Sequence, residues 1–329
     1  MPLSINTNMA ATRASFYLSK NNNMLQRSLD RLSSGKRINN SSDDAGGLAV
    51  SMKMQGTIDR LTGAESNIGN AISFLQVQDG ILESAGNIVS RMGELKGLYG
   101  DVLKNTTDKA TYDAEFSDLQ GQLYQITQTK FNGVSLFGDK DNLGTPTSLV
   151  FGTTPTGNGL LNVYTTADGS SGSSVGIEQG LLQSAMTFTY NTAGGVQSVT
   201  TSTAGWDDSN ANFGNNAVDD GNLSLAVSDG ATANKLNLAD MNTDLFTLAL
   251  ENIATMRATN GGSVSRLQYA QEDVLAQKTN LEAANGRIMD VDIARESTEL
   301  AKYNVLVQAS ASMVAQASVS TDVALMLLR

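Results

Sequence analysis

The side chains that most often perform catalysis at neutral pH are missing from this chain. Its 329 residues include no histidine and no cysteine. Without imidazole the chain lacks the commonest general base, the commonest zinc ligand and every catalytic triad built on histidine. Without thiols it has neither disulfides nor cysteine chemistry. Carboxylates alone remain for acid–base work, so the sequence predicts a protein that is not an enzyme and that uses no cofactor or metal.

Asp43 and Asp44 have the residue type that acid–base catalysis would need. They are adjacent on a connector rich in turn formers, residues 39–47. Acidic side chains just before a helix accept hydrogen bonds from its first N–H groups and favour its dipole. We therefore expect this pair to cap the next helix rather than to act as a catalytic pair.

A second polar run loosely resembles a calcium-binding loop. It contains Asp208, Asn210, Asn212 and Asp219. Such a loop requires glycine at its sixth position and glutamate at its twelfth, but this chain has Phe213 and Asp219 there. We interpret the run as a solvated loop.

The net charge is unevenly distributed along the chain. The total is 22 − 33 = −11, and residues 141–240 contribute −8 of it. A stretch this acidic would repel nucleic acid and is expected to form a solvated outer surface. No window of about 18 apolar residues exists, and the N-terminus lacks the features of a secretory signal peptide. From these features alone we expect no nucleic-acid or membrane partner and a cytoplasmic location.

Apolar residues recur every seven positions in two long stretches that contain no proline. The first series is Leu61, Ile68, Leu75, Leu82 and Val89, with Ala64, Ala71, Gln78, Ala85 and Met92 beside it. The second series is Leu267, Val274, Leu281 and Ile288, followed by Ile293, Leu300, Val307 and Val314. A sustained repeat of this period predicts helices that pack against neighbouring helices with left-handed supercoiling.

The N-terminal part of the chain is predicted to be helical. One helix covers residues 3–34 and stops at Gly35, and a second covers about 48–104. A third helix is expected to start near Asp108, after a break at Asn105–Thr107.

The middle of the chain, residues 141–240, is predicted to form hairpins and a small β domain, because Gly and Asn separate its short β-branched runs. The expected strands lie at Ser148–Phe151, Leu160–Thr166, Met186–Tyr190, Val196–Thr203 and Leu223–Val227. Helical patterning returns near Met241 and continues to the C-terminus, with breaks expected near Asn260–Gly262 and Ile288–Asp292. The predicted fold class is mainly α with a β-rich insert: long antiparallel coiled-coil-like helices from both chain ends, with hairpins and a small β domain inserted in the middle.

The two chain ends carry many large apolar side chains, 11 in residues 1–40 and 14 in residues 293–329. A hairpin of two helices cannot bury all of them. We expect the ends to be disordered in a monomer and to become ordered when several copies pack together.

Charged residues at helical spacing give the two ends opposite faces. The basic face is Lys20, Arg27 and Arg31, and the acidic run is Asp292, Glu296 and Glu299. One interpretation is that the two faces dock across a subunit interface, with Arg31 as the main member. The alternative is that both faces are independently solvated, since exposed ion pairs contribute only about 0–1 kcal/mol.

Sequence signatures at both ends resemble those of bacterial flagellins. Residues 31–54 read RLSSGKRINNSSDDAGGLAVSMKM, and NIGNAISFLQVQDGILE (67–83) and FNG (131–133) fit the same pattern. The C-terminal part reads NLEAANGRIMDVDIARESTELAKYNVLVQASASMVAQAS over residues 280–318, and the chain ends in ALMLLR. Two departures are mild: Gly46 stands where alanine is commoner, and QAS (316–318) replaces QAN.

The resemblance implies a structural subunit that self-assembles into the flagellar filament for swimming motility. It implies export without a cleaved signal peptide through the flagellar type III apparatus, with an export chaperone, and an extracellular location that overrides the cytoplasmic one. The other implied partners are further copies of the chain, the filament cap and the hook–filament junction proteins. An alternative within the family is a hook–filament junction protein. A rival from another class, a coiled-coil receptor, would need a membrane span.

The resemblance also implies five parts. They are an N-terminal inner-core helix and connector (1–47), the N-terminal part of a helical core domain (48–140), a variable β-rich outer domain (141–240), the C-terminal part of the helical core domain (241–292) and a C-terminal inner-core helix (293–329). The expected self-assembly residues are Leu18, Leu25, Arg31, Leu32, Ile293, Glu296, Leu300, Val307, Val314, Leu325 and Leu328.

Flagellins share a segment that an innate immune receptor recognises. The matching residues here are Arg91, Glu94 and Leu95 within RMGEL. Gly93 occupies a position where a basic residue is frequent. We expect these three residues to provide the receptor contact.

Overall fold

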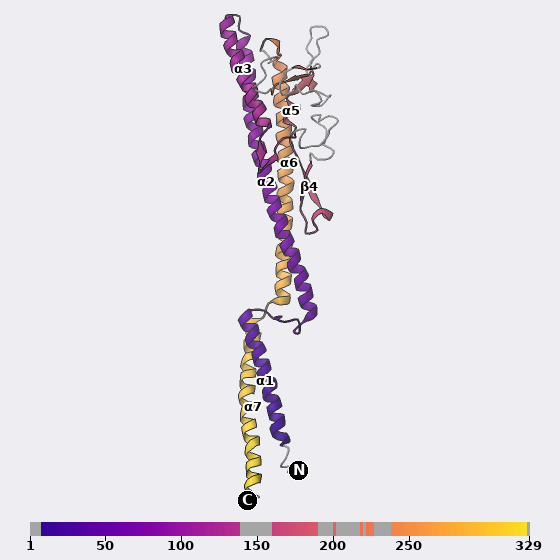
Figure 1. The fold of residues 1–329 in the computed structure, drawn as a ribbon, viewed down its shortest axis with the longest axis vertical. Coiled ribbons are helices and arrows are strands. Elements are labelled where there is room, and N and C mark those ends of the chain that lie inside the picture. The colour runs from indigo at the N-terminus through magenta and orange to yellow at the C-terminus, as the bar shows by residue number, and fades with distance from the viewer. Residues whose placement is uncertain are drawn as a thin grey trace. The chain divides into compact units, whose positions relative to one another are not determined.

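A computed structural model describes residues 8–138, 160–189, 200–201, 218–219, 222–226 and 238–327. The chain divides into two compact units. Unit 1 comprises residues 1–59 and 276–329, and unit 2 comprises residues 60–275. Five long helices dominate the described part, and short strands occupy the middle of the chain (Figure 1). This arrangement confirms the predicted fold class. Within the described residues, no helix is long and apolar enough to cross a membrane.

Helix α1 (Met9–Ser34) has a clear start and a clear stop. Asn8 caps it, because its side chain accepts a hydrogen bond of 3.1 Å from the backbone N–H of Ala11. Gly35 ends it with φ 71°, a left-handed conformation that glycine adopts without strain. The predicted stop at Gly35 is confirmed.

Helix α2 (Ala45–Tyr99) is 55 residues long. It begins a little before the predicted start, after Asp44, whose Oδ1 accepts a hydrogen bond of 2.9 Å from Gly47 N–H. It ends at Tyr99, earlier than predicted, and a short turn leads to α3 (Thr106–Thr127). Asn105 and Asp108 form a reciprocal capping box at the start of α3, so the chain reverses there instead of continuing as one helix.

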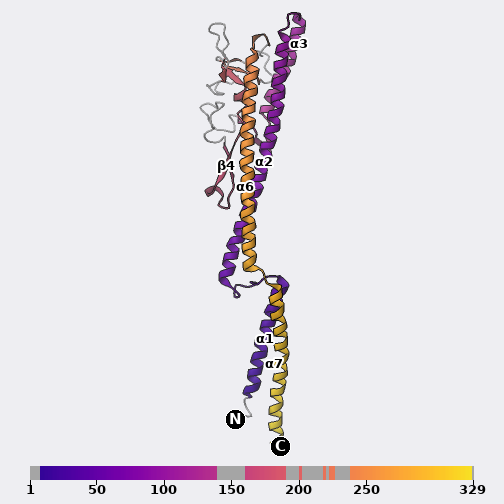
Figure 2. The same ribbon diagram turned by 180° about the vertical axis from the view of Figure 1, so that it is seen from behind.

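The seven-residue series of α2 forms the core of unit 2. Leu61, Ile68, Leu75, Leu82 and Val89 are at most 1% exposed, and the adjacent Ala64, Ala71, Gln78, Ala85 and Met92 are also buried. Helix α6 (Thr243–Met289) runs beside α2 in both views, and its buried residues in unit 2 complete the core (Figures 1 and 2). They include Leu245, Phe246, Ala249, Ile253, Met256, Leu267 and Val274. The predicted helix pairing is therefore present within one chain.

The structure contradicts the break predicted at Asn260–Gly262. Helix α6 continues through these residues to Met289. A glycine inside a helix costs about 1 kcal/mol relative to alanine, which is less than the burial of anchoring residues on either side contributes. Ile253 and Leu267, at 3% and 0% exposure, are such anchors. The second predicted break is confirmed, because α6 ends at Met289 and α7 (Ile293–Leu327) follows.

The strands pair as antiparallel neighbours in three small sheets. The first is a hairpin of β1 (Lys130–Phe131) and β2 (Val134–Ser135), whose turn uses positive φ at Asn132 and Gly133. The second pairs β3 (Leu160–Tyr164) with β4 (Ser174–Glu178). The third has the order β6-β5-β8-β7, from Thr200–Thr201, Thr187–Thr189, Asn222–Ser224 and Val218–Asp219. One short helix, α5 (Leu182–Ala185), and two 3-10 turns, Gly169–Ser171 and Leu238–Asp240, accompany the strands.

Some predicted features of the middle region lie outside the described residues. These are the strand at Ser148–Phe151 and most of the calcium-like run. The predicted strand at 196–203 is described only at β6, and the other three expected strands are present as β3, β5 and β8.

Candidate functional site: the terminal helix pair and its charged pocket

Helices α1 and α7 pack against each other along their length as an antiparallel pair within unit 1 (Figures 1 and 2). Hydrogen bonds mark both ends of the pair's outer half: Asn8 Nδ2 donates to the Ala317 carbonyl at 2.8 Å, and Asn21 Nδ2 donates to Ser310 Oγ at 2.9 Å. The apolar residues along the seam are only half-buried. They are Leu18, Met24, Leu25 and Leu32 of α1, and Leu300, Tyr303, Val307 and Val314 of α7.

The pair leaves a second set of large apolar side chains exposed to solvent. On α1 these are Met9, Phe16, Tyr17 and Leu29, and on α7 they are Ile293, Val305, Leu306, Met313 and Val319. Phe16 and Ile293 are 66% and 67% exposed. An exposed apolar stripe of this kind marks an interaction surface. The sequence predicted that these ends become ordered only on assembly; the structure gives them a helical conformation but no core.

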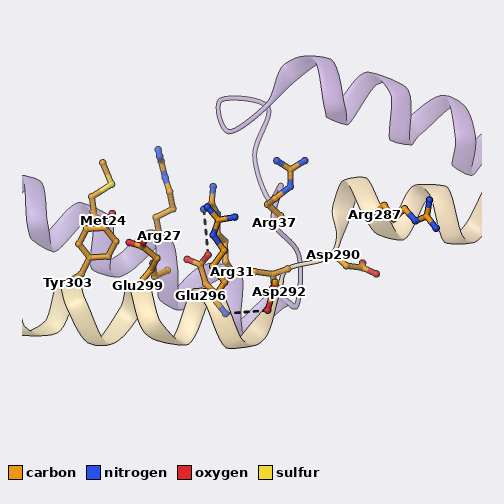
Figure 3. A pocket seen from close by; sticks show the side chains of 13 residues that line it. Met24, Arg27, Arg31, Arg37, Arg287, Asp290, Asp292, Glu296, Glu299 and Tyr303 are labelled. Atoms are coloured by element: carbon orange, nitrogen blue, oxygen red, sulfur yellow. Dashed lines mark hydrogen bonds and ion pairs between the residues drawn. The ribbon is translucent and has the colours of Figure 1, made fainter.

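A charged pocket of about 500 Å³ lies at the other end of the pair, where the connectors of unit 1 meet (Figure 3). Five arginines and four carboxylates line it. They are Arg27, Arg31, Arg37, Arg287 and Arg295, with Asp290, Asp292, Glu296 and Glu299. The interior of unit 1 is therefore polar where the interior of unit 2 is apolar.

Arg31 and Glu296 form the central ion pair of this pocket, with 3.8 Å between Arg31 Nη1 and Glu296 Oε2 (Figure 3). Their side chains are 25% and 11% exposed, so solvent screens the pair only in part. Arg31 Nε is buried and has no hydrogen-bond partner within the described residues. The sequence interpretation placed this pairing between two copies; the structure shows Arg31 and Glu296 paired within one chain.

The other members of the two predicted faces have different partners. Arg27 pairs with Asp43 at 3.5 Å rather than with the acidic run. Asp292 caps α7, because its Oδ1 accepts hydrogen bonds from Ala294 and Arg295 N–H at 3.0 and 3.2 Å. Glu299 pairs with Lys302 on its own helix at 3.5 Å. The predicted face-to-face contact is thus reduced to one ion pair.

Arg37 joins the two connectors of unit 1, a role that sequence reasoning missed. Its guanidinium donates to the Ile288 carbonyl at 3.2 and 2.9 Å, and its backbone N–H donates to the Met289 carbonyl at 2.6 Å. Val291 N–H donates to the Gly35 carbonyl at 3.1 Å. A basic residue beside helix-terminal carbonyls also favours the helix dipole. These contacts hold the connector after α1 against the connector before α7.

The adjacent carboxylates Asp43 and Asp44 serve as helix and turn caps. Asp44 caps α2 as predicted, while Asp43 Oδ2 accepts hydrogen bonds from Asn39 and Asn40 N–H at 3.3 and 3.2 Å. Both are committed to backbone groups. Within the described residues, no group of three or more acidic side chains is placed to hold a metal ion.

The remaining predicted assembly residues fall into two groups. Leu18, Leu25, Leu32, Leu300, Val307 and Val314 lie half-buried on the seam. Ile293 points away from it and is exposed. The side chain of Leu325 and all of Leu328 lie outside the described part of the chain.

The predicted receptor residues lie on α2 in unit 2. Arg91 donates to Glu94 and Glu115, each at 2.8 Å, and these hydrogen bonds raise the pKa of Arg91 above its ordinary value. Arg91 and Glu94 are surface residues, with side chains 42% and 60% exposed. Leu95 is fully buried, which speaks against a direct receptor contact by its side chain. The receptor contact stays a prediction.

Comparisons with known proteins agree with the terminal signatures. The bacterial flagellin N-terminal helical region matches residues 5–142, and the bacterial flagellin C-terminal helical region matches residues 243–328. A flagellin of Bacillus subtilis (strain 168) is 33% identical over 330 aligned positions, covering 99% of both chains. The flagellar filament 33 kDa core protein of Treponema phagedenis is 31% identical, also over 99% of both chains.

One solved structure shows a more limited likeness. The crystal structure of Bacillus cereus flagellin matches with a TM-score of 0.40 and 21% identity, covering 67% of this chain and 94% of that one. Family membership therefore rests on the sequence comparisons, which span both terminal regions and nearly the whole length. The chain belongs to the bacterial flagellin family.

Proposed function

We propose that this chain is a structural subunit that self-assembles into the bacterial flagellar filament. The observation that carries the proposal is the pair α1 and α7, which exposes apolar side chains along both helices. Covering one such side chain contributes about 1.5–3 kcal/mol, so packing several copies of the pair together is strongly favourable. The names of relatives that match over nearly their whole length, flagellin and filament core protein, support the same function.

The assembly surface we propose combines the half-buried seam with the exposed apolar stripe. Its residues are Leu18, Leu25, Arg31, Leu32, Ile293, Glu296, Leu300, Val307, Val314, Leu325 and Leu328, together with the exposed Phe16, Val305 and Met313. In this proposal the parts 1–47 and 293–329 form the inner tube of the filament. Parts 48–140 and 241–292 surround them, and 141–240 is outermost.

The finer expectations follow from the same proposal. The chain would act outside the cell, in the filament, after export through the flagellar type III apparatus with a chaperone. The filament cap and the hook–filament junction proteins would be its neighbours, and it would perform no catalysis. The reported relatives carry filament names, which favours the filament subunit over the junction-protein alternative.

Electron microscopy of the purified, concentrated chain tests this function. We expect long tubes from the full chain and none from residues 41–292, which lack the terminal helix pair. Circular dichroism of the shortened chain provides the control, since its unit 2 helices should persist. A full chain that stays monomeric at high concentration and with added filament fragments as seeds would contradict the proposal.

A further inference from the structure

The turn between α2 and α3 presents two apolar side chains almost entirely to solvent. Val102 is 96% exposed and Leu103 is 91% exposed, the highest values among the large apolar residues of the described part. The turn is held in place by its own hydrogen bonds: Leu103 N–H donates to Asp101 Oδ1 at 2.9 Å, and Lys104 N–H donates to the Asp101 carbonyl at 3.4 Å. The turn is therefore a fixed apolar knob.

A groove of about 610 Å³ lies on the same unit, at the seam between α2 and α6. Leu75, Ala254, Gly261 and Val264 contribute to its apolar lining. Asn260 also lines it and is 7% exposed, yet its Nδ2 has no hydrogen-bond partner within the described residues. A buried N–H without an acceptor costs about 1–3 kcal/mol, and a backbone carbonyl brought by an incoming turn would remove that cost.

The glycines of the groove have no explanation within one chain. Nothing lies within 4 Å of a Cβ added at Gly261 or Gly262, so neither position is forced by packing. Both lower the intrinsic stability of α6, because glycine is a poor helix former. Their use is understandable if another segment approaches the helix backbone closely at this point.

The knob cannot reach the groove of its own chain. The α2 wall of the groove ends at Asp79 and the helix ends at Tyr99, so about 30 Å of rigid helix separates them. Charge also favours a contact between two copies. Arg257 pairs with Asp79 and Glu83 at 2.9 and 3.2 Å, which leaves one excess negative charge at the groove, and Lys104 directly follows Leu103. A hydrogen bond with Tyr112 raises the pKa of Lys104, so it is cationic at neutral pH.

We propose that the Val102–Leu103 knob of one copy seats in the Leu75–Val264 groove of the next copy. This inference rests on the proposed filament function. The contact uses two different surfaces of the same chain, so repeating it produces an open strand of copies rather than a closed pair. The knob and groove would therefore fix the register between successive subunits along such a strand.

Disulfide cross-linking tests this contact cleanly, because the natural chain has no cysteine. The double variant Leu103→Cys/Gly261→Cys, oxidised after assembly, should give a ladder of covalent multimers on non-reducing electrophoresis. An equal mixture of the two single variants should stop at dimers. The matched control is Leu103→Cys/Gly63→Cys, since Gly63 on α2 is also open to a Cβ but lies outside the groove; it should give no ladder.

The outcomes separate this inference from the filament proposal. Filaments of the test variant without a ladder would overturn the knob-and-groove contact and leave the filament function standing, whereas absence of filaments from the natural chain would refute the function itself. If the cysteine variants fail to assemble, Val102→Ser/Leu103→Ser provides a second measurement. We expect its critical concentration for assembly to rise roughly tenfold or more. An unchanged critical concentration, with Val134→Ser as the control substitution, would overturn the inference.

Discussion

Units 1 and 2 are both built from long helices with apolar heptad positions, yet only unit 2 buries them fully. The heptad residues Ile68 and Leu82 of α2 are 0% exposed, whereas Leu300 and Val307 of α7 are half-buried. In unit 2, α3 and the small sheets supply additional packing partners, but the pair α1 and α7 has only itself. A heptad repeat therefore predicts that a helix needs a neighbour without showing whether the same chain provides it.

The largest expected effect contrasts one leucine from each unit. Leu82→Ala should destabilise the dilute chain by about 2–5 kcal/mol, because it leaves a cavity in a packed core. Leu300→Ala should cost under about 1 kcal/mol there, since its site is half-open. Thermal unfolding followed by circular dichroism measures both. In assembly assays the ranking should change, with Leu300→Ala raising the critical concentration. Equal destabilisation of the dilute chain by both variants would erase the distinction between the units.

The connector of unit 1 is a tightly packed exception, and it offers a second contrast. A Cβ at Gly47 would lie 2.5 Å from Asp44 Oδ2 and 2.8 Å from Ile38 Cδ1, whereas at Gly46 the nearest atom is 3.6 Å away. We expect Gly47→Ala to destabilise the start of α2 by about 1–3 kcal/mol. Gly46→Ala should stabilise it by about 0.5–1 kcal/mol. Amide exchange of the first turns of α2 gives the readout, and protection that rises in both variants would show that this packing is unimportant.

The smallest expected effect concerns the pair Arg31 and Glu296. Reversing one charge, as in Arg31→Glu, places two carboxylates together and should weaken the α1–α7 contact by about 1 kcal/mol, slowing polymerisation. The double variant Arg31→Glu/Glu296→Arg should recover part of the rate. Light scattering during seeded growth measures this. Lys20→Glu serves as the control reversal, because Lys20 lies exposed on the same helix. No recovery in the double variant would argue that the pair does not hold the helices together.

Local sequence signals predicted the elements of unit 2 well. The heptad residues of α2 and their neighbours through Gln78 are buried as expected, and Gly35 ends α1 where its position indicated. The break predicted at Gly261 was wrong because tertiary packing around it outweighs the low helix propensity of glycine. Asn105 was interpreted as a breaker, and it acts as one by capping α3.

Contacts between distant segments were harder to predict from the sequence. The hydrogen bonds from Arg37 to the Ile288 carbonyl join residues separated by 251 positions, and the acceptor is a backbone group that any residue type would present. For Arg31 and Glu296 the complementary charges were visible, but helical spacing does not reveal whether two faces meet within one chain or between copies. The unpartnered Asn260 amide likewise has no signature in the sequence.

Amide hydrogen exchange on the dilute chain and on its assembled polymer tests the central claim most directly, namely that the terminal helix pair needs other copies to bury its apolar surface. Exchange reports the free energy of local opening, residue by residue. We predict that amides of α1 and α7 exchange rapidly in the dilute chain while those of α2 around Leu82 stay protected, and that assembly protects both. Strong protection of α1 and α7 in a chain shown to be monomeric would contradict the account.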